Sequence, residues 1–329
     1  MKSEIIKEYL EKYPELPTLT LAKLIYKENP SVFTDVENCR YMIRYNRGAS
    51  GKKNNEALKD RRFVRDIRQP YNPHKMPESD EREFLPFVIP NQFKNVLVFG
   101  DVHIPYHSVD SLNIMIDFAI KKGVDSILLN GDIIDFHQLS SFVKDPRKRS
   151  FSQELKILNE FLDRLDEIFG VKIFYKIGNH EERFENYLRV KAPELIGQSE
   201  FNLDILCRFG ERNITVIKDK RTIQFSKLNI LHGHELKGSI IPPVNAARGV
   251  FLRTKSPTLV NHFHTKTAHG ESTLNDKYIE CWSVGCMCEL HPEYAVNNRW
   301  IHGFAIVERF EDNSFAVNNY KIIKGRVYK

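Results

Sequence analysis

Polar residues that could bind metal ions follow five short apolar runs in this chain of 329 residues. Each run has the length and composition of a buried β-strand. The polar segments are Gly-Asp-Val-His at 100–103, Gly-Asp-Ile-Ile-Asp at 131–135, Gly-Asn-His-Glu at 178–181, His-Gly-His at 232–234 and Asn-His-Phe-His at 261–264. One such arrangement usually marks a turn, but five by chance are improbable. Because α/β proteins place their chemistry at the carboxyl edge of a sheet, these side chains are expected to meet there.

Seven of these strand-end side chains carry donor atoms that divalent metals bind. They are Asp101, His103, Asp132, Asn179, His232, His262 and His264. Neutral imidazole suits Zn, Fe, Ni or Mn better than Mg or Ca. Seven ligands are too many for one tetrahedral ion, and the mixture of histidine, aspartate and asparagine argues against a structural zinc site. The set predicts two divalent ions about 3.5–4 Å apart that share a carboxylate, as in two-metal hydrolases.

Strands and helices alternate from about residue 93 onward. Apolar periodicity predicts strands over 96–99, 126–130 and 171–177 and helices near 109–121, 153–169 and 182–191. This alternation is typical of an α/β sheet covered by helices. Further short strands, expected to form a second, mixed sheet, are predicted over 214–217, 222–225, 228–231, 258–261, 278–284, 303–310 and 315–322. Asp312-Asn313-Ser314 predicts a hairpin turn between the last two strands.

Taken in order, the five polar segments resemble the motifs of the calcineurin-like metallophosphoesterase superfamily, over about residues 95 to 310. The resemblance implies an α/β fold in which a two-sheet β-sandwich is flanked by helices. It also implies a dinuclear metal centre at the strand ends, where a hydroxide attacks phosphorus in line. Manganese is the expected ion, with iron, zinc or nickel as alternatives.

The resemblance also implies a role for each site residue. Asp101, His103 and His264 would hold one ion, Asp132 would bridge both ions, and Asn179, His232 and His262 would hold the second. His180 is the implied general acid, or a group that steadies the transition state. Asp135 is an implied partner that orients a ligand.

Three positions depart from the family pattern. Asn261 stands where the family usually has glycine, and asparagine tolerates a left-handed backbone, so the turn is expected to be kept. Phe136 and Ile177 stand where the phosphoprotein phosphatase branch has phosphate-gripping arginines. This argues against that branch and leaves the nuclease and phosphodiesterase branches open.

Residues 1–50 predict a small all-helical domain of three helices, similar to a helix-turn-helix. Thr18 or Thr20 can cap the second helix, and Thr34-x-x-Glu37 reads as a capping box for the third, which Gly48 would end. Nucleic-acid contact is predicted for one face of the third helix, which carries Arg40, Arg44 and Arg47. Between residues 40 and 75 there are eleven Lys or Arg against three Asp or Glu, which suits a phosphate backbone. The alternative is a packing module whose arginines only flank a buried face.

The predicted domains are therefore the helical domain over 1–50, a proline-rich connecting segment over 51–92 and a catalytic domain over 93–329. The connecting segment has room for a short helix around 56–67. No apolar run approaches the roughly 18 residues needed to span a bilayer, so no membrane partner is expected. Five cysteines without disulfide spacing and a polar amino end favour a cytoplasmic protein.

We expect a metal-dependent phosphoesterase acting on nucleic acid as a nuclease or phosphodiesterase, with DNA or RNA bound by the helical domain. The first alternative is a phosphatase or phosphodiesterase for nucleotides or other small phosphoesters, with the helices used for oligomerisation. The second is a nucleic-acid-binding regulatory protein with a non-catalytic metal site. The complete ligand set and His180 argue against that reading.

Overall fold

The structure, a computed structural model, describes residues 2–13, 16–46, 73–77, 85–140, 150–236, 245–292 and 295–329. The chain divides into two units, Met1–Val64 and Arg65–Lys329. Three sequence predictions, for Arg47, Gly48 and the helix over 56–67, lie outside the described residues. Among the residues that are described, no helix is both long and apolar enough to cross a bilayer.

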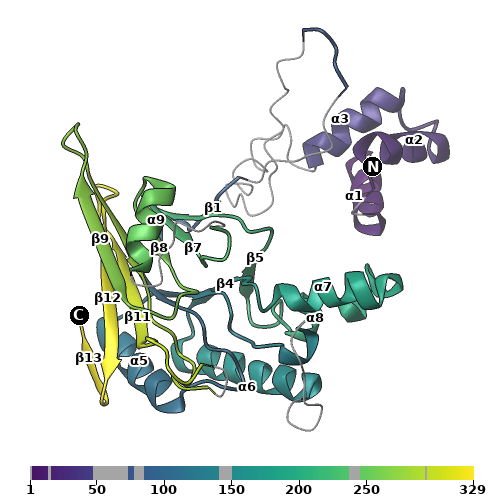
Figure 1. The fold of residues 1–329 in the computed structure, drawn as a ribbon. Coiled ribbons are helices and arrows are strands. Elements are labelled where there is room, and N and C mark those ends of the chain that lie inside the picture. Colours follow the sequence, from purple (N-terminus) through teal and green to yellow (C-terminus); the bar gives the residue numbers. More distant parts are fainter. Residues whose placement is uncertain are drawn as a thin grey trace. The chain divides into compact units, whose positions relative to one another are not determined.

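A seven-stranded sheet forms one layer of the larger unit (Figure 1). Its order is β13 (Arg326–Tyr328), β12 (Phe315–Ile323), β11 (His302–Arg309), β2 (Asn95–Phe99), β3 (Ser126–Asn130), β4 (Lys172–Lys176) and β5 (Ile214–Ile217). Strands β2 to β5 are parallel, whereas β11 pairs antiparallel with β2 and with β12. Parallel pairing places the carboxyl ends of β2, β3 and β4, and thus the first three polar segments, at one edge of the sheet.

The second sheet has six strands. Its order is β1 (Phe87–Val88), β6 (Ile223–Phe225), β7 (Leu228–Leu231), β8 (Thr258–Val260), β10 (Tyr278–Ser283) and β9 (Thr267–Ser272). Strands β7 and β8 are parallel, so the last two polar segments, which follow these strands, also lie together at the carboxyl edge of their sheet. Strand β1 falls within the predicted connecting segment over 51–92, so the end of that segment belongs to this sheet.

The predicted fold class, an α/β sandwich of two sheets flanked by helices, is confirmed. The predicted membership of the second sheet is wrong for β5, β11 and β12, which belong to the first sheet. Apolar alternation predicts that a strand exists, but its neighbours depend on long-range pairing that alternation does not encode. The hairpin between β11 and β12 is confirmed, with Asn313 in the left-handed region at φ 61°.

Residues of each central strand alternate between two apolar cores. In β2, Val96 and Val98 pack between the sheets, whereas Leu97 and Phe99 pack against the helices. Helices α5 (Val109–Lys122) and α6 (Phe151–Phe169) cover the outer face of the first sheet, and α9 (Ala246–Thr254), which was not predicted, covers the second. The remaining helical segments are η1 (His137–Leu139), α7 (Glu182–Lys191), η2 (Pro193–Leu195), η3 (Ser199–Phe201) and α8 (Leu203–Leu206).

The described residues of the smaller unit form three helices, α1 (Lys2–Lys12), α2 (Thr18–Glu28) and α3 (Val36–Asn46), packed around a core of their own. Helix α2 begins after Pro17 without a side-chain cap, so neither Thr18 nor Thr20 has the predicted capping role. In the first turn of α3, the Asn38 backbone N–H donates to Asp35 Oδ1 over 2.7 Å. The predicted cap at Thr34 is therefore wrong, because the neighbouring carboxylate accepts this hydrogen bond instead.

Candidate metal centre

The seven predicted ligands meet at the carboxyl edge of the sandwich. The first sheet provides four of them, after β2, β3 and β4, and the second sheet provides three, after β7 and β8. Five of the seven have a left-handed backbone, an uncommon conformation for residues other than glycine. These are Asp101, His103, Asp132, His262 and His264. Such conformations concentrate at functional sites, where the surrounding structure imposes them.

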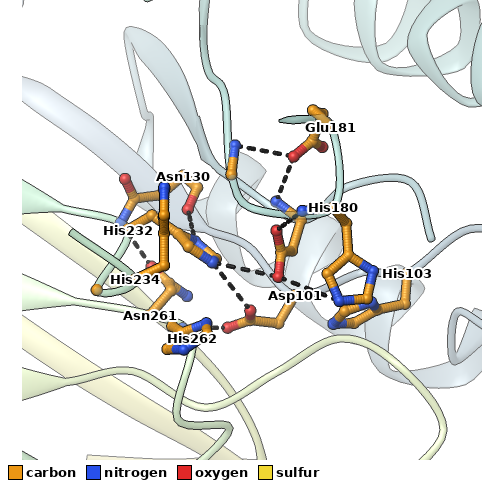
Figure 2. Close-up of polar contacts among 12 residues, drawn as sticks. Asp101, His103, Asn130, His180, Glu181, His232, His234, Asn261 and His262 are labelled. Carbon is orange, nitrogen blue, oxygen red and sulfur yellow. Dashed lines mark hydrogen bonds and ion pairs between the residues drawn. The ribbon is translucent and has the colours of Figure 1, made fainter. Parts of the chain in front are cut away.

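Two aspartates and the imidazoles around them lie within a few ångströms of one another (Figure 2). Asp132 Oδ2 lies 3.2 Å from His232 Nε2, and Asp101 Oδ1 lies 3.5 Å from His264 Nε2. His103 Nε2 lies 3.2 Å from His264 Nε2. Donor atoms of Asp132, His232 and His262 all lie within 4.8 Å of one another, as do those of His103, Asp132 and His180. This spacing suits two ions that share Asp132.

Charge in this cluster is balanced between aspartates and histidines. Burial disfavours a charged His232, but attraction to Asp132 raises the pKa of His232 to about 10. Burial likewise opposes a charge on His264, but Asp101 raises the pKa of that imidazole to about 10. The pKa of His262 falls to about 4, chiefly because of burial, so this ring is neutral. Metal ligands must be deprotonated, so ions that bind here displace protons from His232 and His264.

Several buried donor atoms in the cluster make no hydrogen bond within the described part of the chain. Asp101 Oδ1, Asn179 Oδ1 and His232 Nε2 are all of this kind. A buried polar atom without a partner is costly, and metal coordination removes that cost. The residues therefore fit two divalent ions held by oxygen and nitrogen. The assignment of individual ligands to each ion stays a prediction.

His180 lies at the side of the cluster with its ring held by Asp135. His180 Nδ1 lies 3.0 Å from Asp135 Oδ1, and His180 Nε2 lies 3.7 Å from Asp132 Oδ2. Burial lowers the pKa of His180, but the two aspartates outweigh it and the pKa is raised overall. Asp135 Oδ1 also lies 3.4 Å from His103 Nδ1, so one carboxylate orients both imidazoles. His180 can thus hold a proton beside the ions, as its predicted role requires.

Arg183, in the first turn of α7, reaches the same imidazole. Its Nη2 lies 2.9 Å from His180 Nε2, and its Nη1 donates to the Asp135 carbonyl oxygen over 2.7 Å. Phe136, in contrast, is fully buried and stacks on the rings of Phe151 and Phe184. The sequence places no arginine at Phe136 or Ile177, but the fold brings Arg183 to the site from a different element. Its guanidinium can contact a phosphoryl oxygen at this position.

Glu181, which the sequence reading did not single out, joins the second and third polar segments. Its carboxylate accepts hydrogen bonds from the backbone N–H groups of Asp132 and Ile133, at 3.0 and 2.8 Å, and from Tyr175 Oη at 2.8 Å. The close approach also requires glycine at position 178, because a Cβ there would lie 2.3 Å from Asp132 Oδ1. Glu181 therefore holds Asp132 and the turn before His180 in place.

A buried ion pair supports the loop that carries His232. Lys176 Nζ lies 2.9 Å from Glu235 Oε1, and Glu235 Oε2 accepts from the Gly233 backbone N–H over 2.7 Å. Burial lowers the pKa of Lys176, and Glu235 restores it only in part. A lysine in an otherwise apolar strand was the signal in the sequence for this pair. The pair fixes the end of β4 against the loop that follows β7.

Glu235→Gln is expected to destabilise the protein by about 3–5 kcal/mol, since it leaves the Lys176 charge buried without its partner. Urea unfolding at pH 7 measures this change. The matched control is Glu160→Gln, in a pair with Lys156 that is exposed and 3.9 Å apart, with an expected loss below about 0.5 kcal/mol. Equal effects of the two substitutions would contradict a supporting role for the buried pair.

The contribution of Glu235 also depends on pH. Burial opposes ionisation of Glu235, but Lys176 and His234 outweigh it and lower the pKa to about 2, from an ordinary value of 4.5. A lowered folded-state pKa means that this stabilisation is complete above about pH 4.5 and is lost as the pH falls toward 2. The difference in unfolding free energy between wild type and Glu235→Gln should shrink over the same range.

Asn261 contacts the first sheet through its side chain. Asn130 Nδ2 donates to Asn261 Oδ1 and to the Leu231 carbonyl oxygen, each over 2.8 Å. Asn261 is not in the left-handed region, which His262 and His264 occupy instead, so the expectation of a left-handed turn at Asn261 is wrong. Asparagine at this position bonds the two sheets together where glycine could not.

Three of the cysteines are buried in or after β10, and one of them touches the site. Cys288 Sγ lies 3.8 Å from His264 Nδ1. The imidazole of His264 therefore faces Asp101 with one nitrogen and this thiol with the other. Sequence spacing alone did not indicate this contact.

Comparison with known proteins adds a family match. A sequence model described as calcineurin-like phosphoesterase matches residues 94–296, which is more than half of the chain. The Gene 54 protein of Mycobacterium phage L5 is 24% identical to this chain in an alignment of 229 residues that covers 65% of this chain and 88% of that protein.

Solved structures with similar folds cover most of the larger unit. Vps29 from Cryptosporidium parvum is 14% identical with a TM-score of 0.41, covering 72% of this chain and 95% of that one. A dimetal phosphatase from Danio rerio is 15% identical with a TM-score of 0.37, covering 69% and 96%. The phosphoesterase Yfce from E. coli is 13% identical with a TM-score of 0.33, covering 68% and 98%.

Proposed function

Because this chain belongs to the calcineurin-like phosphoesterase family, as its motifs predict, we propose that its phosphoester hydrolase activity acts on nucleic acid. Two divalent ions, with manganese expected first, would be held by Asp101, Asp132 and the other five strand-end ligands. When bound, such ions lower the pKa of water and offset charge on phosphoryl oxygens.

The described side chains supply the remaining functions. His180 holds the proton that the leaving oxygen needs, and Asp135 keeps its ring in place at 3.0 Å. Arg183, with a largely buried guanidinium beside His180 Nε2, binds a non-bridging phosphoryl oxygen. Glu181 and Glu235 hold the loops that carry Asp132 and His232. Each group is therefore positioned before substrate arrives, which lowers the cost of ordering them during the reaction.

The observation that favours nucleic acid is the exposed face of α3. Tyr41 and Tyr45 are 62% and 49% exposed, and Arg44 between them is also exposed. At spacings of three and four residues these side chains share one face, opposite the buried Cys39 and Ile43. Aromatic rings stack on bases and arginine binds phosphates, so this face suits a nucleic-acid strand.

The other predicted arginines of this face contribute differently. Arg40 Nη1 lies 3.0 Å from Glu37 Oε1 on the same helix, and this carboxylate weakens the attraction of Arg40 for a phosphate. Arg47 lies outside the described residues. The proposed contact face is therefore Tyr41, Arg44 and Tyr45.

The test is hydrolysis with added Mn²⁺ of bis-p-nitrophenyl phosphate, p-nitrophenyl phosphate and labelled single- and double-stranded DNA and RNA. Cleavage of a nucleic acid that weakens with added salt supports the proposal. Turnover of the small esters alone would overturn it in favour of a small-molecule phosphoesterase. Tight nucleic-acid binding without any turnover would favour a regulatory protein.

Substitutions on the α3 face are expected to weaken nucleic-acid binding without changing turnover of bis-p-nitrophenyl phosphate. Tyr45→Ala removes one base stack and should weaken binding about tenfold, and Arg44→Ala should reduce the salt slope by about 1. Fluorescence anisotropy of a labelled oligonucleotide at several salt concentrations measures both. Lys23→Ala, at an exposed position on α2, is the control, and a loss of binding equal to that of Arg44→Ala would show only a general charge effect.

A further inference from the structure

A hollow of about 620 Å³ lies beside α7, next to the metal centre and separate from its ligands. Ile177 follows β4 and Lys218 follows β5, so the hollow occupies the carboxyl edge of the next parallel pair of the first sheet. Its wall residue Glu182 lies 3.4 Å from His234, two residues after the candidate ligand His232. We call this cavity the α7 hollow. A group bound in it would lie next to a phosphate held at the metal centre.

The walls of the α7 hollow are apolar at the base and aromatic at the rim. Phe184 and Leu188 of α7 are buried, at 6% and 7% exposure, and form the base. Ile196 and Phe201 line it from the segment after α7 and remain 48% and 40% exposed. A flat, partly apolar ligand can cover these exposed side chains and remove them from water.

The cations that line the α7 hollow are already paired. Arg189 lies 2.9 Å from Glu185, and Lys220 lies 3.2 Å from Glu182. Lys218 lies 2.7 Å from Asp204. Because each of these cations faces a carboxylate, the hollow does not present the unpaired positive charge that a phosphate or another anion needs.

Two amide side chains at the rim, in contrast, are available for recognition. In the described part of the chain, the side chains of Asn186 and Gln198 make no hydrogen bond. Amides offer a donor and an acceptor together, which matches the edges of nucleobases. Phe201 on the same rim offers a ring on which a base can stack.

We propose that the α7 hollow binds a nucleobase of the substrate, on the nucleotide next to the phosphate that is hydrolysed. A neutral, planar group with donors and acceptors on its edge fits an apolar base, an exposed aromatic ring, free amides and cations that are already paired. The proposal rests on the proposed function, and it assigns recognition of a nucleoside to the larger unit itself. The α7 hollow is then a specificity site distinct from the α3 face.

The test compares two substrates that share a leaving group, using the full chain with Mn²⁺. One is the p-nitrophenyl ester of thymidine 5′-monophosphate, and the other is methyl p-nitrophenyl phosphate, which has no base. We expect a KM about tenfold lower for the thymidine ester, in line with one stacked base. Phe201→Ala should raise that KM to the value of the methyl ester and leave turnover of the methyl ester unchanged.

One control variant, a second variant of the hollow and a binding measurement complete the test. Ile205→Ala removes a side chain on α8 that is 59% exposed and does not line the hollow, and it should change neither KM. Gln198→Ala should raise the KM of the thymidine ester alone, without removing an apolar group. Saturation-transfer NMR with thymidine, which requires no turnover, should show binding to wild type and its loss in Phe201→Ala.

Equal KM values for the two esters, or an unchanged thymidine KM in Phe201→Ala, would overturn the proposal for the hollow even if DNA or RNA is cleaved. A preference for the thymidine ester without any cleavage of nucleic acid would support the hollow and overturn the nucleic-acid proposal. The two proposals therefore fail by different observations.

Discussion

Asp132→Ala is expected to abolish phosphoester hydrolysis and to lower the metal content of the purified protein. Asp132 Oδ2 lies 3.2 Å from His232 Nε2 and 3.7 Å from His180 Nε2, so this carboxylate is common to two candidate ligand groups, one with His232 and His262 and one with His103 and His180. Its pKa lies well below the ordinary value, because attraction to the surrounding histidines outweighs the effect of burial. The loss of stabilisation supplied by bound metal is worth several kcal/mol, so turnover should fall by about 10³-fold or more.

Metal content by plasma mass spectrometry and turnover of bis-p-nitrophenyl phosphate measure the two effects of Asp132→Ala. Asp117→Ala, at an exposed position on α5, is the control and should leave both unchanged. Asp132 Oδ1 also accepts a hydrogen bond from the His180 backbone N–H over 2.9 Å, so the substitution can disturb the local fold. Circular dichroism therefore checks that the variant is folded. A folded variant with full turnover would remove the dinuclear model.

His180→Ala is expected to slow hydrolysis by about 10²–10⁴-fold while the metal content stays as in wild type. The expected loss follows from its geometry, because His180 Nδ1 is held by Asp135, while Nε2 lies between Asp132 Oδ2 at 3.7 Å and Arg183 Nη2 at 2.9 Å. Arg183 can only donate, so Nε2 carries the proton once that guanidinium turns to the phosphoryl oxygen. The size of the loss should depend on the leaving group. A p-nitrophenolate leaves well without a proton, whereas the sugar oxygen of a nucleic acid needs one, so nucleic-acid cleavage should suffer more.

His269→Ala is the control for this comparison, because His269 lies on β9 and bonds the exposed Glu271 rather than the cluster. Steady-state turnover of both substrate types, with metal analysis of each variant, separates the outcomes. Loss of metal from His180→Ala would make His180 a ligand, which its distance to His103 and Asp132 permits. An equal loss on both leaving groups would argue against proton donation.

The polar segments and the strands before them were predictable because each prediction is local. A buried strand that ends in Asp or His, such as the one before Asp132, shows its apolar run and its polar end within a few residues. The helices over α5, α6 and α7 were predictable for the same reason, since their apolar faces repeat at helical spacing. The α9 helix was missed because Gly249 and the short apolar stretch around it resemble a loop as much as a helix.

The groups that support the site depend on contacts between distant segments. Three strands, β5 to β7, and helices α7 and α8 separate Lys176 from Glu235 along the chain, and only the folded protein brings the two side chains to 2.9 Å. The sequence shows Arg183 as one of many basic residues, but the 2.9 Å between its Nη2 and His180 Nε2 depends on the direction in which α7 runs from the sheet. The sheet to which β5 and β11 belong could not be predicted from local sequence either. Apolar residues alternate in the same way in strands of both sheets.

The division of the ligands between the sheets has a consequence for the lifetime of the protein. With four ligands on one sheet and three on the other, bound ions cross-link the two halves of the sandwich. Only the folded state offers all seven ligands together, so stability should rise with the free ion concentration once it exceeds the dissociation constant. Ion supply therefore sets both how fast the enzyme works and how long each molecule survives unfolding and proteolysis.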